Sequence, residues 1–147
     1  MLDALPLTVT LDDVLFCHAT PRDDTEIVLV DSPFERWAEV LDGVVQDVVV
    51  LGHTHMPFTR LVDRRLIVNP GSVGMPYGTG GAHWALLGEG VELRRTRYDV
   101  EDACRFLTAR CAYPEIEEWA DFFVRNPASD AEALRVFSAS VRGTSAT

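Results

Sequence analysis

The chain has 147 residues, 47% hydrophobic and 24% charged, which suits one globular domain with a sizeable core. Its formal net charge of -10 argues against a broad nucleic-acid surface, because binding to a phosphate backbone depends on Lys and Arg. No apolar run approaches the roughly 20 residues needed to span a bilayer. The first residues also lack the basic start and apolar stretch of a signal peptide. We therefore expect a cytoplasmic protein with no membrane partner.

Short β-branched runs divided by Gly, Pro and Asp fill the first two-thirds of the chain and predict strands. The predicted strands are Leu7–Leu11, Val14–Cys17, Asp47–Leu51, Thr59–Val62, Arg65–Val68, His83–Leu87 and Val91–Arg97. Between the second and third strands, Ser32–Leu41 is predicted to be a helix, with Ser32 as N-cap and Pro33 at the first helical position. We expect Asp63 and Arg64 to turn a hairpin.

The chain from about Asp99 to Arg142 is predicted to be helical, and its helices are expected to pack against the sheet. The predicted helices are Val100–Cys111, Glu115–Arg125 and Ala133–Val141. Asp99 is a candidate cap for the first, and Ser129 and Glu132 form a capping box before the last. Residues 143–147 are predicted to be a disordered tail. The three cysteines form no CxxC pair and are expected to be reduced and buried.

Three predicted apolar strands each end in a polar cluster. The strand ending at Cys17 leads to His18, the next leads to Gly52-His53-Thr54-His55, and the third leads to Asn69-Pro-Gly-Ser72. Sites in open α/β sheets form at the carboxyl ends of strands. These clusters therefore converge on one site if the three strands are parallel neighbours.

His53 and His55 are the sharpest signal in the sequence. In an extended backbone, residues two apart point the same way, so both imidazoles are expected on one side with Thr54 on the other. Such a pair suits one divalent ion, or one ligand for each of two ions about 3.5–4 Å apart. Together with His18, the pair predicts a metal site. Cys17 is expected to point away from His18 into the core.

The neighbouring polar residues leave alternatives open. The segment from Asn69 to Ser72 is either a tight structural turn or a loop that shapes the metal pocket. Arg22 either holds a phosphate oxygen or is a solvated loop residue. Asp23 and Asp24 are interpreted as a solvated acidic turn. His83, inside a predicted strand, is interpreted as structural.

Three segments carry a resemblance to a known family. They are Leu15-Phe-Cys-His18-Ala-Thr-Pro-Arg22, Val50-Leu-Gly-His53-Thr-His55-Met-Pro-Phe58 and Val68-Asn-Pro-Gly-Ser-Val-Gly74. In order and spacing they resemble the second half of a calcineurin-like metallophosphoesterase of the small bacterial phosphodiesterase type. The resemblance runs from about Leu5 to Asp99. It implies an α/β fold in which residues 1–98 are the C-terminal half of an α/β/β/α sandwich and residues 99–142 are a helical extension.

The resemblance also implies a site and a reaction. His18 and His53 would bind one metal and His55 the other, with Asn69, Gly71 and Ser72 lining the pocket. The family cofactors are two divalent ions of manganese, iron, nickel or zinc. The reaction is metal-assisted attack of water on a phosphodiester or phosphomonoester, so the expected partner is a phosphorylated small molecule or nucleotide.

The sequence departs from the family pattern in its carboxylates. The earlier family motifs, Asp-x-His, Gly-Asp and Gly-Asn-His, do not occur in these 147 residues. Histidines without a bridging carboxylate hold two dications poorly. We therefore expect at most one weakly bound ion and little activity in this chain alone. We also expect self-association through the sheet edge that the absent family half would leave uncovered. The alternatives are a non-catalytic metal- or nucleotide-binding module, a half-site completed by a partner chain, and a structural zinc protein. The last is the weakest, because closed zinc sites need four ligands.

Overall fold

The computed structural model describes residues 4–144, with side chains up to Ser140. Internal contacts divide the chain into two compact units, Met1–Pro70 and Gly71–Thr147. The predicted domain boundary at residue 98 is placed where the family resemblance ends. It rests on a different criterion from this division by contacts and stays a prediction. The predicted tail begins inside a helix, because residues 143 and 144 belong to α4 (Asp130–Thr144), and its last three residues lie outside the described part.

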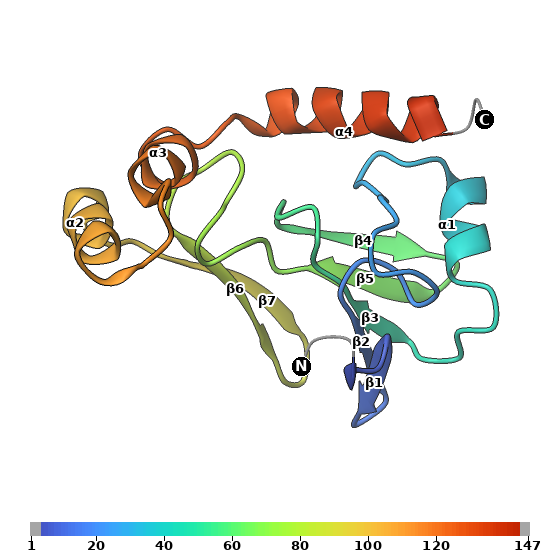
Figure 1. The fold of residues 1–147 in the computed structure, drawn as a ribbon. Coiled ribbons are helices and arrows are strands. Elements are labelled where there is room, and N and C mark those ends of the chain that lie inside the picture. Colours follow the sequence, from blue (N-terminus) through green and yellow to red (C-terminus); the bar gives the residue numbers. More distant parts are fainter. Residues whose placement is uncertain (1–3, 145–147) are drawn as a thin grey trace. The chain divides into compact units, whose positions relative to one another are not determined.

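A mixed five-stranded sheet forms the centre of the first unit, in the order β1-β2-β3-β5-β4 (Figure 1). The strands are β1 (Thr8–Leu11), β2 (Val14–Cys17), β3 (Val48–Val50), β4 (Phe58–Val62) and β5 (Arg65–Asn69). β2, β3 and β5 run parallel, whereas β1 and β4 are antiparallel to their neighbours. Each strand end lies within one residue of its predicted position, and the α/β fold is confirmed.

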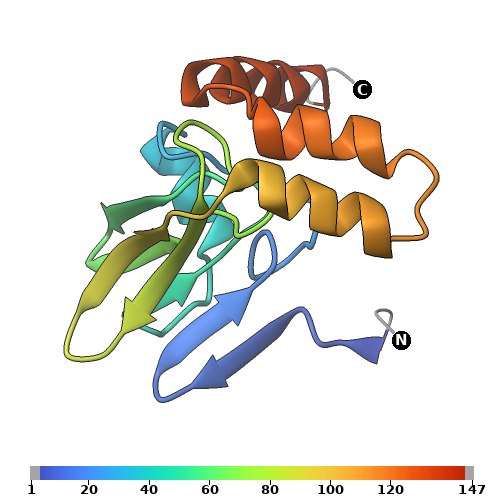
Figure 2. The ribbon, with the colours of Figure 1, turned by 90° about the vertical axis from the view of Figure 1, so that its left-hand side faces the viewer.

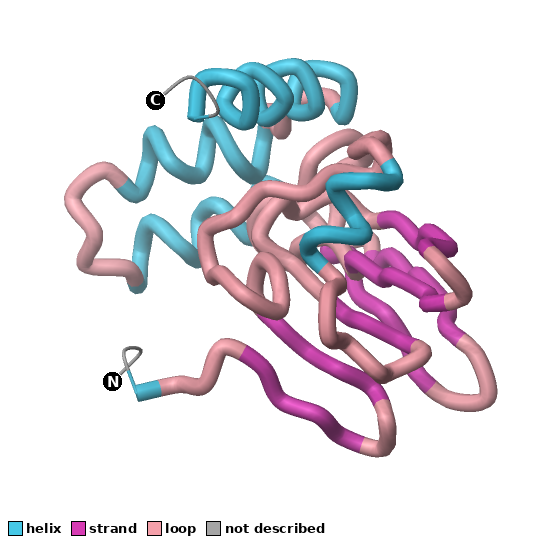
Figure 3. The backbone as a smooth tube through the Cα atoms, turned by 90° about the vertical axis from the view of Figure 1, so that its right-hand side faces the viewer, coloured by secondary structure: helices cyan, strands magenta, loops and turns pink. Residues whose placement is uncertain are grey.

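Helix α1 (Phe34–Val40) packs on one face of this sheet (Figure 3). The face presents Leu15, Val49 and Ile67, which lie side by side in register across β2, β3 and β5 and are all buried. Trp37 of α1 is fully buried against this row. The core therefore fixes the relative positions of the three parallel strands whose carboxyl ends carry the polar clusters.

The predicted capping of α1 is wrong. Pro33 occupies the N-cap position and makes no side-chain cap. The Ser32 hydroxyl accepts the backbone N–H of Leu29 at 2.9 Å, and the Ser32 N–H donates to the Leu29 carbonyl at 3.0 Å. Ser32 thus closes the loop before the helix, because a serine hydroxyl bonds to nearby backbone groups in a turn as readily as at a helix start.

Strand β1 forms one edge of the sheet, paired with β2 alone among the described strands (the blue hairpin in Figure 2). Alternate apolar side chains on and before it are 43–67% exposed: Leu5, Leu7, Val9 and Leu11. Residues two apart on a strand share a face, so Val9 and Leu11 belong to one apolar surface. β1 is therefore an edge strand with exposed apolar side chains, while self-association through it stays a prediction.

The second unit contains a hairpin and a group of helices. Its elements are β6 (Ala82–Leu87), β7 (Val91–Thr96), α2 (Val100–Arg110), α3 (Ile116–Ala120), a π-helical turn η2 (Asp121–Arg125) and α4. Both predicted caps are present, since Asp99 accepts from the Asp102 N–H and Ser129 exchanges bonds with Glu132. The small core of this unit lies between α2, α3 and η2, around Cys104. The expected packing of the helices against the five-stranded sheet stays a prediction.

Within residues 4–144 no helix is long and apolar enough to cross a membrane. All three cysteines are free. Cys104 is buried as predicted and Cys17 packs against the first core, but Cys111 is exposed. The prediction of burial fails at Cys111 because it caps α2 at the carboxyl end instead of lying inside the helix.

Candidate metal centre

The carboxyl ends of three neighbouring strands lie together at one end of the sheet, and each carries or precedes a polar residue. β3 lies between β2 and β5 and is parallel to both, so the carboxyl ends of the three strands lie together. His18 follows β2, the segment from Gly52 follows β3, and Asn69 is the last residue of β5. The Gly52 N–H donates to the His18 carbonyl at 2.7 Å. The predicted convergence of strand ends is thereby confirmed.

His18 and His53 form a pair at this edge. Nε2 of His18 lies 3.3 Å from Nδ1 of His53, and the ring centroids are 5.1 Å apart in an edge-to-face arrangement. Two ligands of one ion, each at about 2.0–2.1 Å from it, lie roughly 3.0–3.4 Å apart. The separation of the two nitrogens therefore fits two imidazoles that share one divalent ion, although a direct hydrogen bond between the rings has the same length.

The backbone around the histidines is not extended, which corrects one step of the prediction. His53 and His55 have φ values of +59° and +56°, in the left-handed region that residues with a side chain rarely adopt. The Thr54 N–H donates to the Gly52 carbonyl at 2.6 Å, so His53 is the centre of a tight three-residue turn. The strand alternation that would put both imidazoles on one side does not apply here.

Asn69 closes this turn from the neighbouring strand. Its Nδ2 donates to the Gly52 carbonyl at 2.8 Å and to the Thr54 hydroxyl at 3.1 Å. Asn69 is 0% exposed and Thr54 is 1% exposed. Asn69 is therefore a buried brace of the turn, because its side chain binds the residues on both sides of His53.

The remaining predicted site residues are less closely defined. His55 is half-buried, and its role as a ligand stays a prediction. Gly71 and Ser72 belong to the second compact unit. The Ser72 hydroxyl accepts the Met75 N–H at 2.9 Å, which is the bonding of a structural turn. The lining of the pocket by Gly71 and Ser72 stays a prediction.

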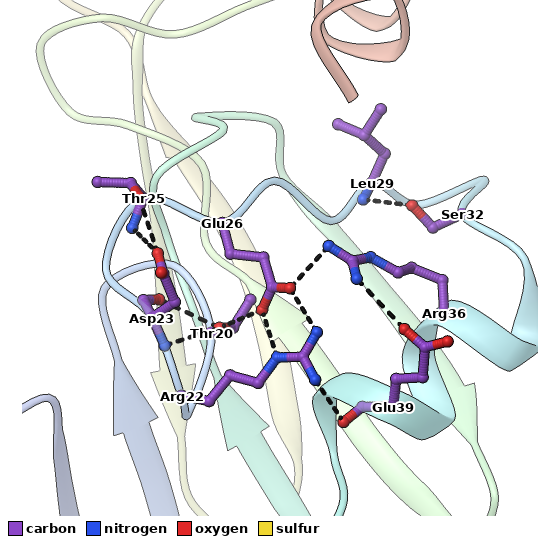
Figure 4. Close-up of polar contacts among 9 residues, drawn as sticks. All are labelled: Thr20, Arg22, Asp23, Thr25, Glu26, Leu29, Ser32, Arg36 and Glu39. Atoms are coloured by element: carbon purple, nitrogen blue, oxygen red, sulfur yellow. Dashed lines mark hydrogen bonds and ion pairs between the residues drawn. The ribbon is translucent and has the colours of Figure 1, made fainter. Parts of the chain in front are cut away.

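Arg22 is engaged by the carboxylate of Glu26, a residue that the sequence pattern does not single out (Figure 4). Its Nη2 and Nε contact the two oxygens of Glu26 at 2.6 and 3.0 Å, and its Nη1 donates to the Glu39 carbonyl at 3.2 Å. Glu26 also binds Arg36 at 2.7 Å and the Thr20 hydroxyl at 2.7 Å. A phosphate would have to compete with Glu26 for Arg22, so the phosphate-binding role of Arg22 stays a prediction.

The acidic residues near His53 behave as a turn. One oxygen of Asp23 accepts the backbone N–H and the hydroxyl of Thr25, at 2.7 and 2.8 Å, and the first of these bonds chiefly lowers the pKa of Asp23. Asp24 is exposed. These features agree with the interpretation of a solvated acidic turn.

Burial and neighbouring groups shift the pKa values of two side chains near the carboxyl ends of β2 and β3. Partial burial, followed by the neighbouring His18, lowers the pKa of His53 and favours the neutral imidazole that binds metals. Burial raises the pKa of the Cys17 thiol to about 11, so it is protonated at neutral pH and is a poor ligand. Within residues 4–144, no three or more His, Cys, Asp and Glu side chains are grouped to hold a metal ion. The described residues therefore bring two candidate ligands together, His18 and His53, without a third His, Cys, Asp or Glu grouped beside them.

Glu26, Thr20 and the bracing role of Thr54 were not predicted from the sequence. The only local signal for Glu26 is its spacing of four residues from Arg22, a pattern that is informative in helices but not in a loop. Nε2 of His83 lies 2.7 Å from the Thr79 carbonyl, and its structural role stays an interpretation.

Comparison with known proteins identifies the family of the chain. Residues 2–89 match the family model of the calcineurin-like phosphoesterase superfamily domain. The chain belongs to the calcineurin-like phosphoesterase superfamily. Vps29 of Entamoeba histolytica, solved in complex with Zn²⁺, has a TM-score of 0.34 at 17% identity, which is too low to support an argument about this chain.

Three relatives define how much of a whole protein the chain covers. It is 28% identical to the uncharacterized protein MJ0912 of Methanocaldococcus jannaschii in an alignment of 131 residues that covers 69% of this chain and 50% of that protein. A hypothetical protein PH1004 of Pyrococcus horikoshii has a TM-score of 0.66 at 17% identity, covering 86% of this chain and 54% of that one. A metallophosphoesterase of Sphaerobacter thermophilus has a TM-score of 0.66 at 20% identity, covering 84% and 61%. The chain thus spans about half of the curated relative, and the two structures support the fold alone.

Proposed function

We propose that this chain carries the histidine side of the metal centre of a metal-dependent phosphoesterase. The observation that carries the proposal is the 3.3 Å separation of His18 Nε2 and His53 Nδ1 at the joined carboxyl ends of β2 and β3. Imidazole suits manganese, iron, nickel and zinc, so the donor set does not select one metal. In this proposal His18 and His53 hold one ion and His55 the other.

The reaction is hydrolysis of a phosphodiester or phosphomonoester in a phosphorylated small molecule or nucleotide. Two divalent ions, when bound, polarise the phosphate and lower the pKa of water. The residues of this chain orient those ions. Arg22, once released from Glu26, would donate to a phosphate oxygen, and the backbone from Asn69 to Ser72 would border the substrate.

The carboxylates of the site come from polypeptide other than the described residues. Two points support this part of the proposal: no metal-binding group of three exists within residues 4–144, and the chain spans 50% of its curated relative. In these terms the chain corresponds to the second half of an α/β/β/α sandwich, and residues 1–147 alone hydrolyse little. The same lack of carboxylates favours the second candidate, a non-catalytic module that binds a metal or nucleotide or shares a site with a partner chain.

The test is hydrolysis of bis-p-nitrophenyl phosphate with added Mn²⁺ by the purified chain, its His55→Ala variant and a His83→Ala control. We expect all three to show the same background rate. Turnover that His55→Ala abolishes and His83→Ala preserves would contradict the need for outside carboxylates, while supporting the phosphoesterase class. Equal background rates together with no metal binding would favour a module without a metal.

A further inference from the structure

We propose that Asn69 is a positioning residue of the histidine pair, holding the turn around His53 so that its ring meets His18. Asn69 acts through Gly52 and Thr54, to which its amide donates. The importance of the pair for metal binding rests on the proposed function. The positioning itself is a property of the metal-free chain and is tested separately.

The turn needs an external brace because its backbone is strained. A residue other than glycine keeps a φ of +59° only where contacts with the surrounding structure hold it there. The bond from the Thr54 N–H to the Gly52 carbonyl closes the turn but fixes only three residues. A second left-handed residue, His55, follows at φ +56°, so two residues of this short segment are held in a conformation that side chains disfavour. A change of φ at His53 would change the direction of its ring.

Asn69 supplies the brace at both ends of the turn. One amide nitrogen donates to the Gly52 carbonyl before His53 and to the Thr54 hydroxyl after it. A primary amide nitrogen has two N–H donors, which matches two acceptors from a single atom. Aspartate has the same shape but has no N–H to offer them, and alanine has no polar group at all. Among the residues of this shape, asparagine alone serves both acceptors.

The brace is rigid because Asn69 is held in the sheet. It is fully buried at the end of β5, and its neighbour Val68 accepts the Leu51 N–H at 2.9 Å. The Gly52 N–H in turn donates to the carbonyl of His18. The turn is thus tied to β5 through Asn69 and to β2 through His18, and the two imidazoles are placed by one connected set of bonds.

Three changes at the brace and one control test the proposal. Asn69→Ala removes both bonds, Thr54→Val removes one acceptor while keeping the side-chain shape, and Thr54→Ser keeps the hydroxyl as a conservative match. Ile67→Ala is the control for stability, because Ile67 is fully buried in β5 but belongs to the core under α1. All are compared below their unfolding temperatures, with folding checked by circular dichroism.

Two measurements are made on each variant. In the metal-free chain, NMR of the ring nitrogens and ring protons reports whether the His18 and His53 rings meet. Titration with Zn²⁺ alone then gives the affinity. We expect Asn69→Ala to separate the two rings and to bind Zn²⁺ at least tenfold more weakly, Thr54→Val to move in the same direction, and Thr54→Ser and Ile67→Ala to keep both properties.

The outcomes separate this proposal from the proposed function. Rings that still meet in Asn69→Ala or, if that variant does not fold, in Thr54→Val would overturn the positioning role. Rings that separate equally in Ile67→Ala would overturn it too, because general loosening would then explain the result. If the rings meet in the unaltered chain but it binds no Zn²⁺, the proposed function fails while the NMR comparison still decides the role of Asn69.

Discussion

At the scale of single residues, a buried carboxylate organises the loop that follows His18. The Glu26 side chain is 12% exposed and receives bonds from Arg22, Arg36 and Thr20 (Figure 4). The bond from Arg22 is the main reason that the pKa of Glu26 lies below its ordinary value of 4.5. Because the folded state favours the ionised form, this network stabilises the fold most above the ordinary pKa of glutamate.

Glu26→Gln is expected to lower the free energy of unfolding at pH 7 by about 1–2 kcal/mol, a charged hydrogen-bond contribution reduced for the 47% exposure of Arg22. The lowered pKa sets the sign of the pH dependence. The difference in the free energy of unfolding between Glu26→Gln and the unaltered chain should be largest at neutral pH. It should decrease as the pH falls below 4.5 and disappear below the lower folded-state pKa of Glu26. Urea unfolding at several pH values measures it.

Glu92→Gln is the matched control, because the Glu92 and Arg94 side chains form an exposed pair that is 63% and 43% exposed. It should change stability very little at any pH. A Glu26→Gln effect that grows as the pH falls would show that Glu26 does not favour the ionised form in the folded chain.

The candidate site could be predicted in part at this scale. His18 and His53 follow apolar strands, and the strand-end rule correctly brings them together. The backbone conformation at His53 could not be predicted from the pattern, because the bonds from Asn69 to its turn come from a residue that is distant in sequence. Glu26 was missed for the same reason, since Arg36 comes from a helix ten residues later.

At the scale of elements, the edge strand β1 is the feature with the clearest consequence. An edge strand with exposed apolar side chains is a template for pairing with another chain. Val9 lies in the middle of β1 and is exposed, and neighbouring Leu7 and Leu11 extend the apolar surface. We expect the chain to self-associate through this edge.

Val9→Lys should weaken that association at least tenfold, because a lysine on an edge strand must give up hydration to pair. Sedimentation velocity over a range of concentrations measures the change. Val45→Lys is the control, since Val45 is an exposed apolar residue outside the strands. An unaltered chain that stays monomeric at high concentration, or equal weakening by both changes, would contradict the role of β1.

The elements themselves were predictable because local chemistry sets their limits. β-branched runs mark the strands, and Asp63 and Arg64 take the positive φ values, +43° and +70°, of a tight hairpin turn. The start of α1 was not predictable, because Ser32 has a local backbone partner in Leu29 that competes with the helix cap. The packing of α2 on α3 and η2 also depends on contacts between elements and not on their separate patterns.

At the scale of the whole molecule, the chain belongs to the calcineurin-like phosphoesterase superfamily and spans about half of its curated relative. Its described residues bring two histidines together but assemble no group of three ligands. A two-histidine site binds a divalent ion weakly compared with a site completed by carboxylates. Weak binding that depends on the pair is therefore the property that we expect to define this chain.

The most direct test is a calorimetric titration of the unaltered chain, His53→Ala and His83→Ala with Zn²⁺ at neutral pH. We predict at most one weakly bound ion per unaltered chain and at least tenfold weaker binding by His53→Ala. His83→Ala should bind as the unaltered chain does, because the His83 ring contacts the Thr79 carbonyl instead. Equal affinity in all three chains would contradict the assignment of His18 and His53 as a metal-binding pair.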